Sequence, residues 1–195
     1  MAYIGMRSPV AAVISSHTDG SAISYNTGFV VGKAVEASIN FDKNDNPDYG
    51  DDVIVDNDTG LNGYNGTIDV SMLSAEVRAK LLGWDPDATT ATLYSVGDEN
   101  APYVGFGFIH VGMYQGVKSY EAYWFHKAQF NPASINGSTK QQQIAWNHPQ
   151  MNVTGMGAYI DASGEAKYFD WMEFSTEAAA QAWLYGRANI QSAAT

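Results

Sequence analysis

Residues 103–130 carry a long alternating pattern of side chains, in two runs on either side of Gln115 and Gly116. Both runs are rich in aromatic and β-branched residues, and a tetrapeptide that contains glycine joins them, which predicts a β-hairpin. Because this hairpin is apolar on both faces, one face is expected to pack on the body of its own domain. Much of the other face, which carries Tyr123 and Phe125, is expected to be buried against a second sheet or another subunit.

Two further stretches, residues 28–42 and 64–72, alternate between an apolar and a polar face, with Lys33 as the exception on the first apolar face. The apolar faces, predicted to point into the core, are Phe29, Val31, Val35, Ala37, Ile39 and Phe41 in the first stretch and Tyr64, Ile68, Val70 and Met72 in the second. The opposite faces are small, polar and acidic. This pattern predicts two neighbouring strands of a sheet that lines a solvent-filled surface.

Two short helices are predicted beside these strands. Ser74 is expected to cap the first helix and Gly83 to end it, while the second is expected over residues 176–185, with Gly186 as its stop. Further extended stretches are expected over residues 89–96, 149–160 and 167–174. Together these elements predict a mainly β protein with short helices, in the β-rich α+β class. We expect all 195 residues to form one domain, because β-rich domains often reach this size.

Residues 43–63 form a long polar segment that encloses one short apolar run, residues 53–55. Loops longer than about a dozen residues in a compact domain are usually functional or disordered. The apolar run favours a projecting arm with strand structure that contacts a neighbouring subunit, and a floppy loop is the alternative. The interface candidates on this arm are Asp48, Tyr49, Asp51, Asp52, Val53, Ile54 and Val55.

Charge and composition narrow the function. The formal net charge is −11 and the pI is about 4.5, so specific nucleic-acid binding through phosphate contacts is not expected. The simplest interpretation of the acidity is solubility. There is no cysteine, which excludes disulfides, thiolate metal sites and a cysteine nucleophile. The N-terminal apolar run is too short for a signal peptide or a membrane span, so we expect synthesis in the cytoplasm and no membrane partner.

The usual catalytic and ligand-binding motifs are missing from the sequence. Residues 28–33 superficially resemble a phosphate-binding loop, but the spacing is one residue short and the segment has strand character. An EF-hand calcium loop starting at Asp42 fails, because Pro47 and Val53 occupy the positions that need glycine and glutamate. An irregular cation site remains as an alternative among Asp51, Asp52, Asp56 and Asp58. His110 and His126 lie on the predicted hairpin and are interpreted as interior or interface histidines. We expect no enzyme activity and no cofactor.

The order of these features resembles the major tail proteins, or tail tube proteins, of long non-contractile-tailed bacteriophages. The resembling pieces are AYIGMRSPVAAVI, AISYNTGFVVGKAVEASINF, DYGDDVIVDND, GTIDVSMLSAEVRAKLLGW, PYVGFGFIHV, KSYEAYWFHKAQF, STKQQQIAW and FSTEAAAQAWL. They cover nearly the whole chain in matching order and spacing, although each piece alone is a weak pattern. The piece STKQQQIAW departs from the family, whose members tend to have an acidic residue among the glutamine positions.

The resemblance implies a β-sandwich-like or partial-barrel subunit with a packed helix, assembled as stacked hexameric rings around a lumen that carries DNA. It implies a place in the virion tail and four kinds of partner: further copies of the chain, a tape measure protein, a tail terminator and a distal tail protein. The lumen-facing candidates are Glu36, Ser38, Asn40, Asp42, Asn65, Thr67, Asp69 and Ser71. Such side chains repel phosphate and give bases no stacking platform, so DNA passes without specific binding. An ordinary solvent-facing sheet is the alternative for these residues.

A glycan-binding β-sandwich is the competing hypothesis from another functional class. Aromatic residues make up 13% of the chain, and an acidic surface without cysteine suits stacking on sugars. The candidate platforms are Trp124, Trp146 and Trp171. The state of assembly separates the two hypotheses, because a tube protein forms rings or filaments whereas a glycan-binding module remains a small oligomer.

Overall fold

A computed structural model describes residues 2–86, 93–94, 101–132 and 148–191, and within these ranges the chain is mainly β with two helices. The strands are β1 (Ala2–Ser16), β2 (Ser24–Tyr25), β3 (Phe29–Val30), β4 (Ala34–Lys43), β5 (Asn46–Gly50), β6 (Val53–Asp58), β7 (Leu61–Val70), β8 (Asp85–Pro86), β9 (Leu93–Tyr94), β10 (Val104–Tyr114), β11 (Val117–Pro132), β12 (Gln150–Gly155) and β13 (Phe169–Phe174); the helices are α1 (Ala75–Leu82) and α2 (Glu177–Arg187). The predicted β-rich α+β class is confirmed.

The predicted hairpin is formed by β10 and β11, which are antiparallel. Gln115 and Gly116 connect them with φ angles of 50° and 81°, the left-handed conformation that a two-residue hairpin turn of type I′ requires. Phe106 and Phe125 stack across the two strands, with ring centroids 4.7 Å apart and planes 8° from parallel. The hairpin therefore supplies the centre of the core.

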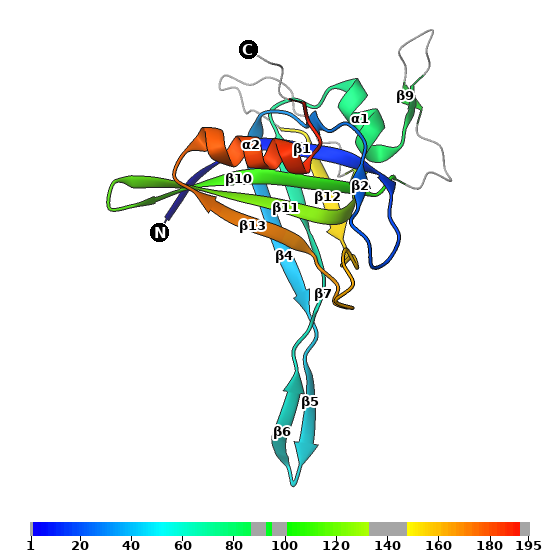
Figure 1. Cartoon of the computed structure of the whole chain (residues 1–195), viewed down its shortest axis with the longest axis vertical. Helices are drawn as coiled ribbons and strands as arrows, with labels where there is room; N and C mark the ends of the chain where they lie inside the picture. Colours follow the sequence, from blue (N-terminus) through cyan, green and yellow to red (C-terminus); the bar gives the residue numbers. More distant parts are fainter. Residues whose placement is uncertain (1, 87–92, 95–100, 133–147, 192–195) are drawn as a thin grey trace, which may run out of the picture.

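The large sheet is antiparallel and has the order β2-β1-β10-β11-β12-β7-β4. β11 changes partner along its length, because its first part pairs with β13 and its last part with β12. The strands consequently form two layers, one of β1, β10, β11 and β13 and the other of β12, β7 and β4, which cross steeply in Figure 1. The sheet is open, with β4 as its last strand, and does not close into a barrel.

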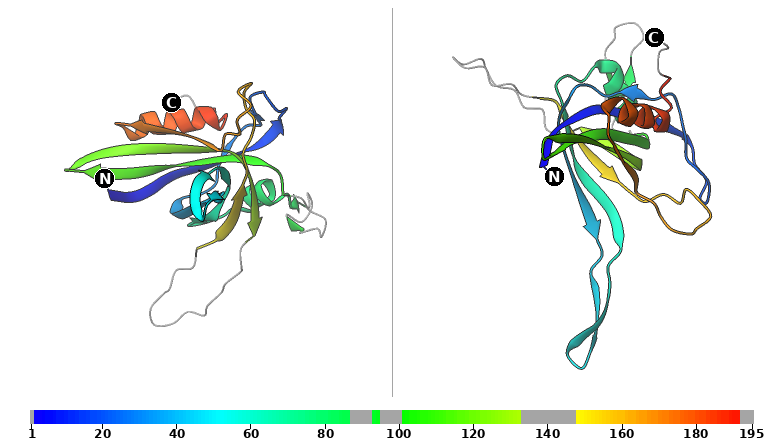
Figure 2. Two further views of the ribbon diagram at one scale, coloured as in Figure 1. Left: turned by 90° about the horizontal axis from the view of Figure 1, so that it is seen from below. Right: turned by 60° about the vertical axis from the view of Figure 1, so that its left-hand side comes forward.

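The space between the two layers holds the larger core cluster, in which Tyr64, Phe106 and Phe125 are at most 1% exposed. α2 covers the other face of the first layer, as Figure 2 shows, and packs Leu184 against Trp124 in a second cluster. Both faces of the hairpin are thus buried within one subunit over much of its length. Burying both faces stabilises a hairpin that would be insoluble alone.

The start of α1 follows the sequence signals, and α2 begins at Glu177, one residue after its predicted start. The Ser74 side chain accepts a hydrogen bond from the backbone N–H of Val77, and Gly83 ends α1 in the left-handed conformation, as predicted. Thr176 caps α2 in the same way. The predicted stop at Gly186 is wrong, because α2 continues to Arg187. Glycine inside a helix costs only about 1 kcal/mol relative to alanine, which packing can offset.

Three residues predicted for the core are exposed instead. Val35 and Phe41 are 42% and 41% exposed on β4, the last strand of its layer, because no described strand pairs with its outer edge. Met72 is 72% exposed because it lies beyond the end of β7. The prediction for residues 89–96 falls outside the described residues except for β9, and Trp146 also lies outside them.

Candidate functional site

The acidic and polar faces predicted from the sequence lie side by side in the structure. β4 and β7 are antiparallel neighbours, and their register places Glu36 opposite Asp69, Ser38 opposite Thr67 and Asn40 opposite Asn65. Tyr64, Ile68 and Val70 on the other face of β7 are buried, as expected. The predicted pairing of these two strands is therefore confirmed.

Two further strands extend this surface, and the sequence analysis did not include them. β12 pairs with β7, and the last part of β11 pairs with β12, so four strands share one polar face. Register partners on this face form three rows across the strands, and Asp42 lies at the margin. The rows are Glu36, Asp69, Gln150; Ser38, Thr67, Asn152, Asn131; and Asn40, Asn65, Thr154, Gln129. We call these twelve residues the polar face. The alternation in QMNVTG was the available signal, because Met151 and Val153 are buried between exposed neighbours.

The polar face is negative and carries no Lys, Arg or aromatic side chain at its twelve positions. The Asn65 side-chain amide donates to both carboxylate oxygens of Asp42 at 2.9 Å, which fixes the Asp42 side chain beside β7. The Asp69 Oδ1 atom is buried and accepts no hydrogen bond from the described residues. Lys127, two residues before Gln129 on β11, lies over the Tyr103 ring at 4.6 Å. A phosphate backbone passing this surface meets repulsion and no grip.

The last of the sequence candidates, Ser71, lies just beyond the end of β7. Its backbone N–H donates to the Lys33 carbonyl at 2.9 Å, and its side chain is exposed. Ser71 therefore sits at the end of the surface instead of within the rows.

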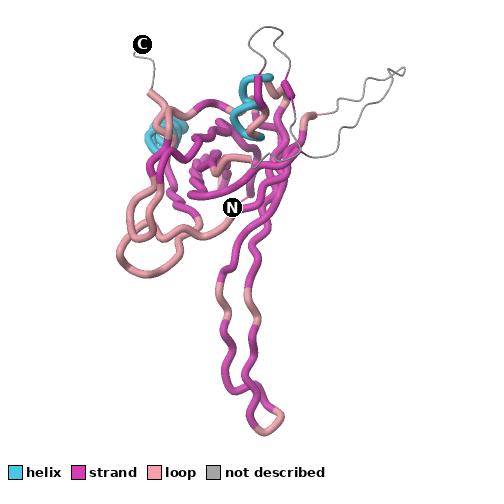
Figure 3. The backbone as a smooth tube through the Cα atoms, turned by 90° about the vertical axis from the view of Figure 1, so that its right-hand side faces the viewer, coloured by secondary structure: helices cyan, strands magenta, loops and turns pink. Residues whose placement is uncertain are grey.

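Residues 46–58 form a second two-stranded sheet, β5 and β6, which extends far from the two layers (Figures 1 and 3). Asp51 and Asp52 make its turn with φ angles of 49° and 64°, a conformation that Asp tolerates better than most residues. The interface candidates Asp48, Tyr49, Asp51, Asp52, Val53, Ile54 and Val55 are all exposed. We call residues 46–58 the arm.

The arm exposes several large apolar side chains. Tyr49, Val53, Ile54 and Val55 are between 55% and 68% exposed. Apart from each other, β5 and β6 make no extensive contact with any other described strand or helix. A two-stranded hairpin is marginally stable at best alone in water, so this arm needs a covering surface.

The hairpin residues predicted to contact another subunit differ in exposure. Phe125 is 1% exposed and stacks on Phe106, so its assignment to a subunit interface is wrong. The second layer of the same subunit covers it. Tyr123 is partly buried, and its hydroxyl donates to Glu121 at 2.9 Å.

His126 lies in a polar cluster that connects β11, β13 and α2. The His126 Nε2 atom is 3.2 Å from Asp170 Oδ1, and Arg187 Nη1 is 2.8 Å from Asp170 Oδ2. The hydrogen bond from His126 is the main cause that lowers the pKa of the Asp170 carboxyl below its ordinary value. His126 also lines a pocket of about 410 Å³ with Tyr25, Trp124 and Arg187. Its partner is 44 residues away, so no local motif could reveal the pair.

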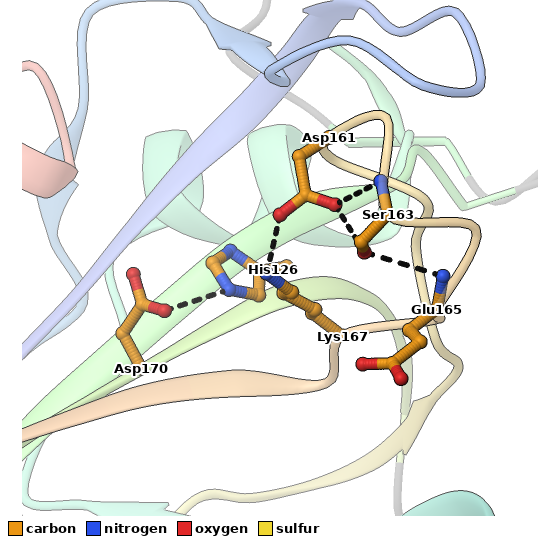
Figure 4. Close-up of polar contacts among 6 residues, drawn as sticks. All are labelled: His126, Asp161, Ser163, Glu165, Lys167 and Asp170. Carbon is orange, nitrogen blue, oxygen red and sulfur yellow. Dashed lines mark hydrogen bonds and ion pairs between the residues drawn. The ribbon is translucent and has the colours of Figure 1, made fainter.

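This cluster does not have the Ser-His-Asp arrangement of a serine hydrolase triad. Figure 4 shows that Ser163 bonds Asp161, which also pairs with Lys167, while His126 faces Asp170. The hydroxyl of Ser163 is therefore not the partner of the His126 ring. Within the described residues, no group of three His, Asp or Glu side chains is arranged to hold a metal ion.

We expect Asp170→Asn to lower the free energy of unfolding by about 1–2 kcal/mol at neutral pH, because charged hydrogen bonds to His126 and Arg187 are lost. A carboxyl whose folded pKa is lowered stabilises the protein above its unfolded pKa and loses that effect as the pH falls through the folded value. The difference between variant and wild type should therefore shrink below about pH 4. Urea unfolding at several pH values measures this difference in the free energy of unfolding.

Asp161→Asn, which breaks an exposed ion pair, is the control and should have a smaller effect. Equal stability of Asp170→Asn and wild type at pH 7 would mean that these contacts of Asp170 do not stabilise the fold.

Of the tryptophans proposed as glycan platforms, the described residues include Trp124 and Trp171, and they differ in exposure. Trp124 is 1% exposed and packs beneath α2, so that part of the hypothesis is wrong. Trp171 is 51% exposed on β13. One exposed tryptophan without a described pocket of its own gives weak support to sugar binding.

Comparison with known proteins adds no relative: no protein-family model matches the chain, and a search of curated proteins finds no match. Neither described helix has the length and apolar character that crossing a membrane requires. Function therefore has to be argued from the polar face and the arm.

Proposed function

We propose that the protein is a tail tube subunit, the major tail protein of a long non-contractile-tailed bacteriophage. Copies assemble as stacked rings, and the polar face of each copy lines the lumen through which DNA is ejected. The tape measure protein, the tail terminator and the distal tail protein are the partners that this role requires.

The polar face is the observation that carries the proposal. Four adjacent strands present twelve small polar or acidic side chains in register, with no cation and no aromatic ring among them. The opposite face of the same strands packs into the core. A surface built this way offers DNA neither counter-charges nor stacking platforms, so it resists binding and lets the polymer slide.

The arm and the open sheet support the assembly part of the proposal. An exposed apolar hairpin that extends from the body suits a contact with a neighbouring ring. The outer edge of β4 pairs with no described strand, and association in a ring can pair such an edge. Virion tail location follows from the same role.

Negative-stain microscopy of the purified, concentrated protein tests the proposal. We expect rings or tubes with a central channel, and sedimentation velocity should show large assemblies whose fraction rises with protein concentration. A protein that remains a small oligomer at every concentration and that binds sugar would favour the glycan-binding hypothesis instead.

A further inference from the structure

The turn end of the β10–β11 hairpin extends sideways beyond the second layer, next to the start of β1 (Figure 1). The part of the hairpin that extends beyond the second layer carries large exposed side chains on one face. Tyr114 is opposite Val117 in the hairpin, and they are 59% and 71% exposed. The Tyr3 hydroxyl reaches Glu121 on the same face, and Trp171 flanks Tyr123 there. We call Tyr3, Tyr114, Val117, Glu121, Trp171 and Glu173 the acidic-aromatic face.

The charge of this face is uncompensated. Glu121 is 7% exposed and accepts hydrogen bonds of 2.8 and 2.9 Å from the hydroxyls of Tyr3 and Tyr123. Glu173 lies directly opposite Glu121 on β13 and is exposed. Burial lowers the pKa of His110, the other neighbour of Glu121, which disfavours a compensating positive charge on its ring. No described Lys or Arg forms an ion pair with either glutamate.

A second exposed apolar region surrounds a lysine at the opposite end of the second layer from the arm. Val30, Val35 and Met72 are 46%, 42% and 72% exposed. The backbone at Lys33 lies beside Met72, since the Lys33 carbonyl accepts a hydrogen bond from the Ser71 N–H and the adjacent Gly32 is close to the Met72 carbonyl. We call Val30, Lys33, Val35 and Met72 the lysine patch.

Lys33 is one of three described lysines that are in no ion pair and lie over no aromatic ring. Six of the described cations have such a contact: Arg7 and Lys167 are in ion pairs, Arg78 and Lys127 lie over aromatic rings, and Lys80 and Arg187 do both. The others that are described without such a contact are Lys43, at the root of the acidic arm, and Lys118, on the opposite face of the hairpin from Val117. Lys33 alone of these three sits among large exposed apolar side chains.

We propose that the acidic-aromatic face of one copy binds the lysine patch of a second copy. Both surfaces are apolar, and their exposed Lys33 and Glu173 side chains are opposite in charge, which favours this pairing over contact of either surface with itself. The arm of another copy is a poor occupant, because Asp48, Asp51, Asp52 and Asp56 would be brought towards Glu121 and Glu173. Since the two surfaces lie at different places on the subunit, the contact is head-to-tail and propagates into a ring or a filament. This inference rests on the proposed tube and names a contact between its copies.

Charge reversal tests the contact. Glu173→Lys and Lys33→Glu each place like charges together, and each should raise the concentration for half-maximal assembly by about tenfold or more. The double variant restores opposite charges in every contact, so its assembly should return towards that of wild type. Sedimentation velocity measures assembly, and circular dichroism verifies that each variant is folded.

Lys118→Glu is the matched control, because it makes the same charge change on the opposite face of the hairpin. It should leave assembly unchanged. If wild type forms tubes and the double variant assembles no better than the worse single variant, the proposed contact is wrong while the tube remains. If wild type does not assemble under any condition, both proposals fail.

Discussion

A subunit in which residues 45–58 are replaced by an Asn-Gly turn is expected to fold normally and to form no tubes. The arm carries the exposed apolar residues Tyr49, Val53, Ile54 and Val55, and β5 and β6 contact mainly each other. Removing it therefore takes little from the core. The backbone N–H of Asn44 donates to the Gly60 carbonyl at 2.7 Å, so the cut ends lie close enough for a short turn.

Thermal unfolding and negative-stain microscopy together measure this result. The melting temperature should remain near that of wild type, while tubes should be missing at concentrations where wild type forms them. A second variant separates the length of the arm from its apolar surface: Val53→Thr, Ile54→Thr and Val55→Thr keep β-branched side chains but replace apolar groups with hydroxyls. It should weaken assembly without abolishing the folded arm. Tubes of normal length from the deletion variant would refute a role of the arm in assembly.

Local sequence patterns predicted individual strands, turns and helices, but not which surfaces pack against them. The turn at Gln115 and Gly116 and the cap at Ser74 depend on neighbouring residues only, and both were predicted. The fate of Phe125 depends on which of several apolar surfaces covers it. Sequence alternation cannot decide that, because a hairpin that is apolar on both faces is equally compatible with a second layer, a helix or another subunit.

The polar face, too, was predicted only in part from local sequence patterns. Alternation identified the polar sides of β4 and β7, and their pairing in register followed from two matching patterns. The contribution of β12 required knowing that it pairs with β7, about 85 residues earlier in the chain. Close packing also decides details that no pattern carries: a Cβ on Gly155 would lie 1.8 Å from the ring of Tyr64, so this position of β12 needs glycine. Long-range contacts of this kind are set by the whole fold.

Replacing Glu36 and Asp69 with lysine is expected to slow DNA passage through assembled tubes without changing tube length. The two carboxylates face each other across β4 and β7, so the pair changes from two negative to two positive charges in every subunit. Around a ring the change repeats, and lysines that contact phosphates release counterions and hold the DNA. The polar face shares no residue with the arm, the acidic-aromatic face or the lysine patch, but Glu36 directly follows Val35 of the patch, so unchanged tube length is the check that the contacts between copies are retained.

DNA ejection from particles that carry the variant measures the effect, and retention of a short duplex by purified tubes at low salt measures it directly. Retention should fall steeply as salt rises, because each phosphate contact adds about 0.9 to the slope of log affinity against log salt. Asp19→Lys with Glu165→Lys makes the same change in net charge at exposed positions outside the polar face and should leave ejection unaltered. Because Asp69 is half-buried, Ser38→Lys with Asn40→Lys tests the same surface at exposed positions. Unchanged ejection and no duplex retention in both polar-face variants would mean that this surface does not line the channel, since DNA cannot pass within reach of a ring of new lysines without binding them.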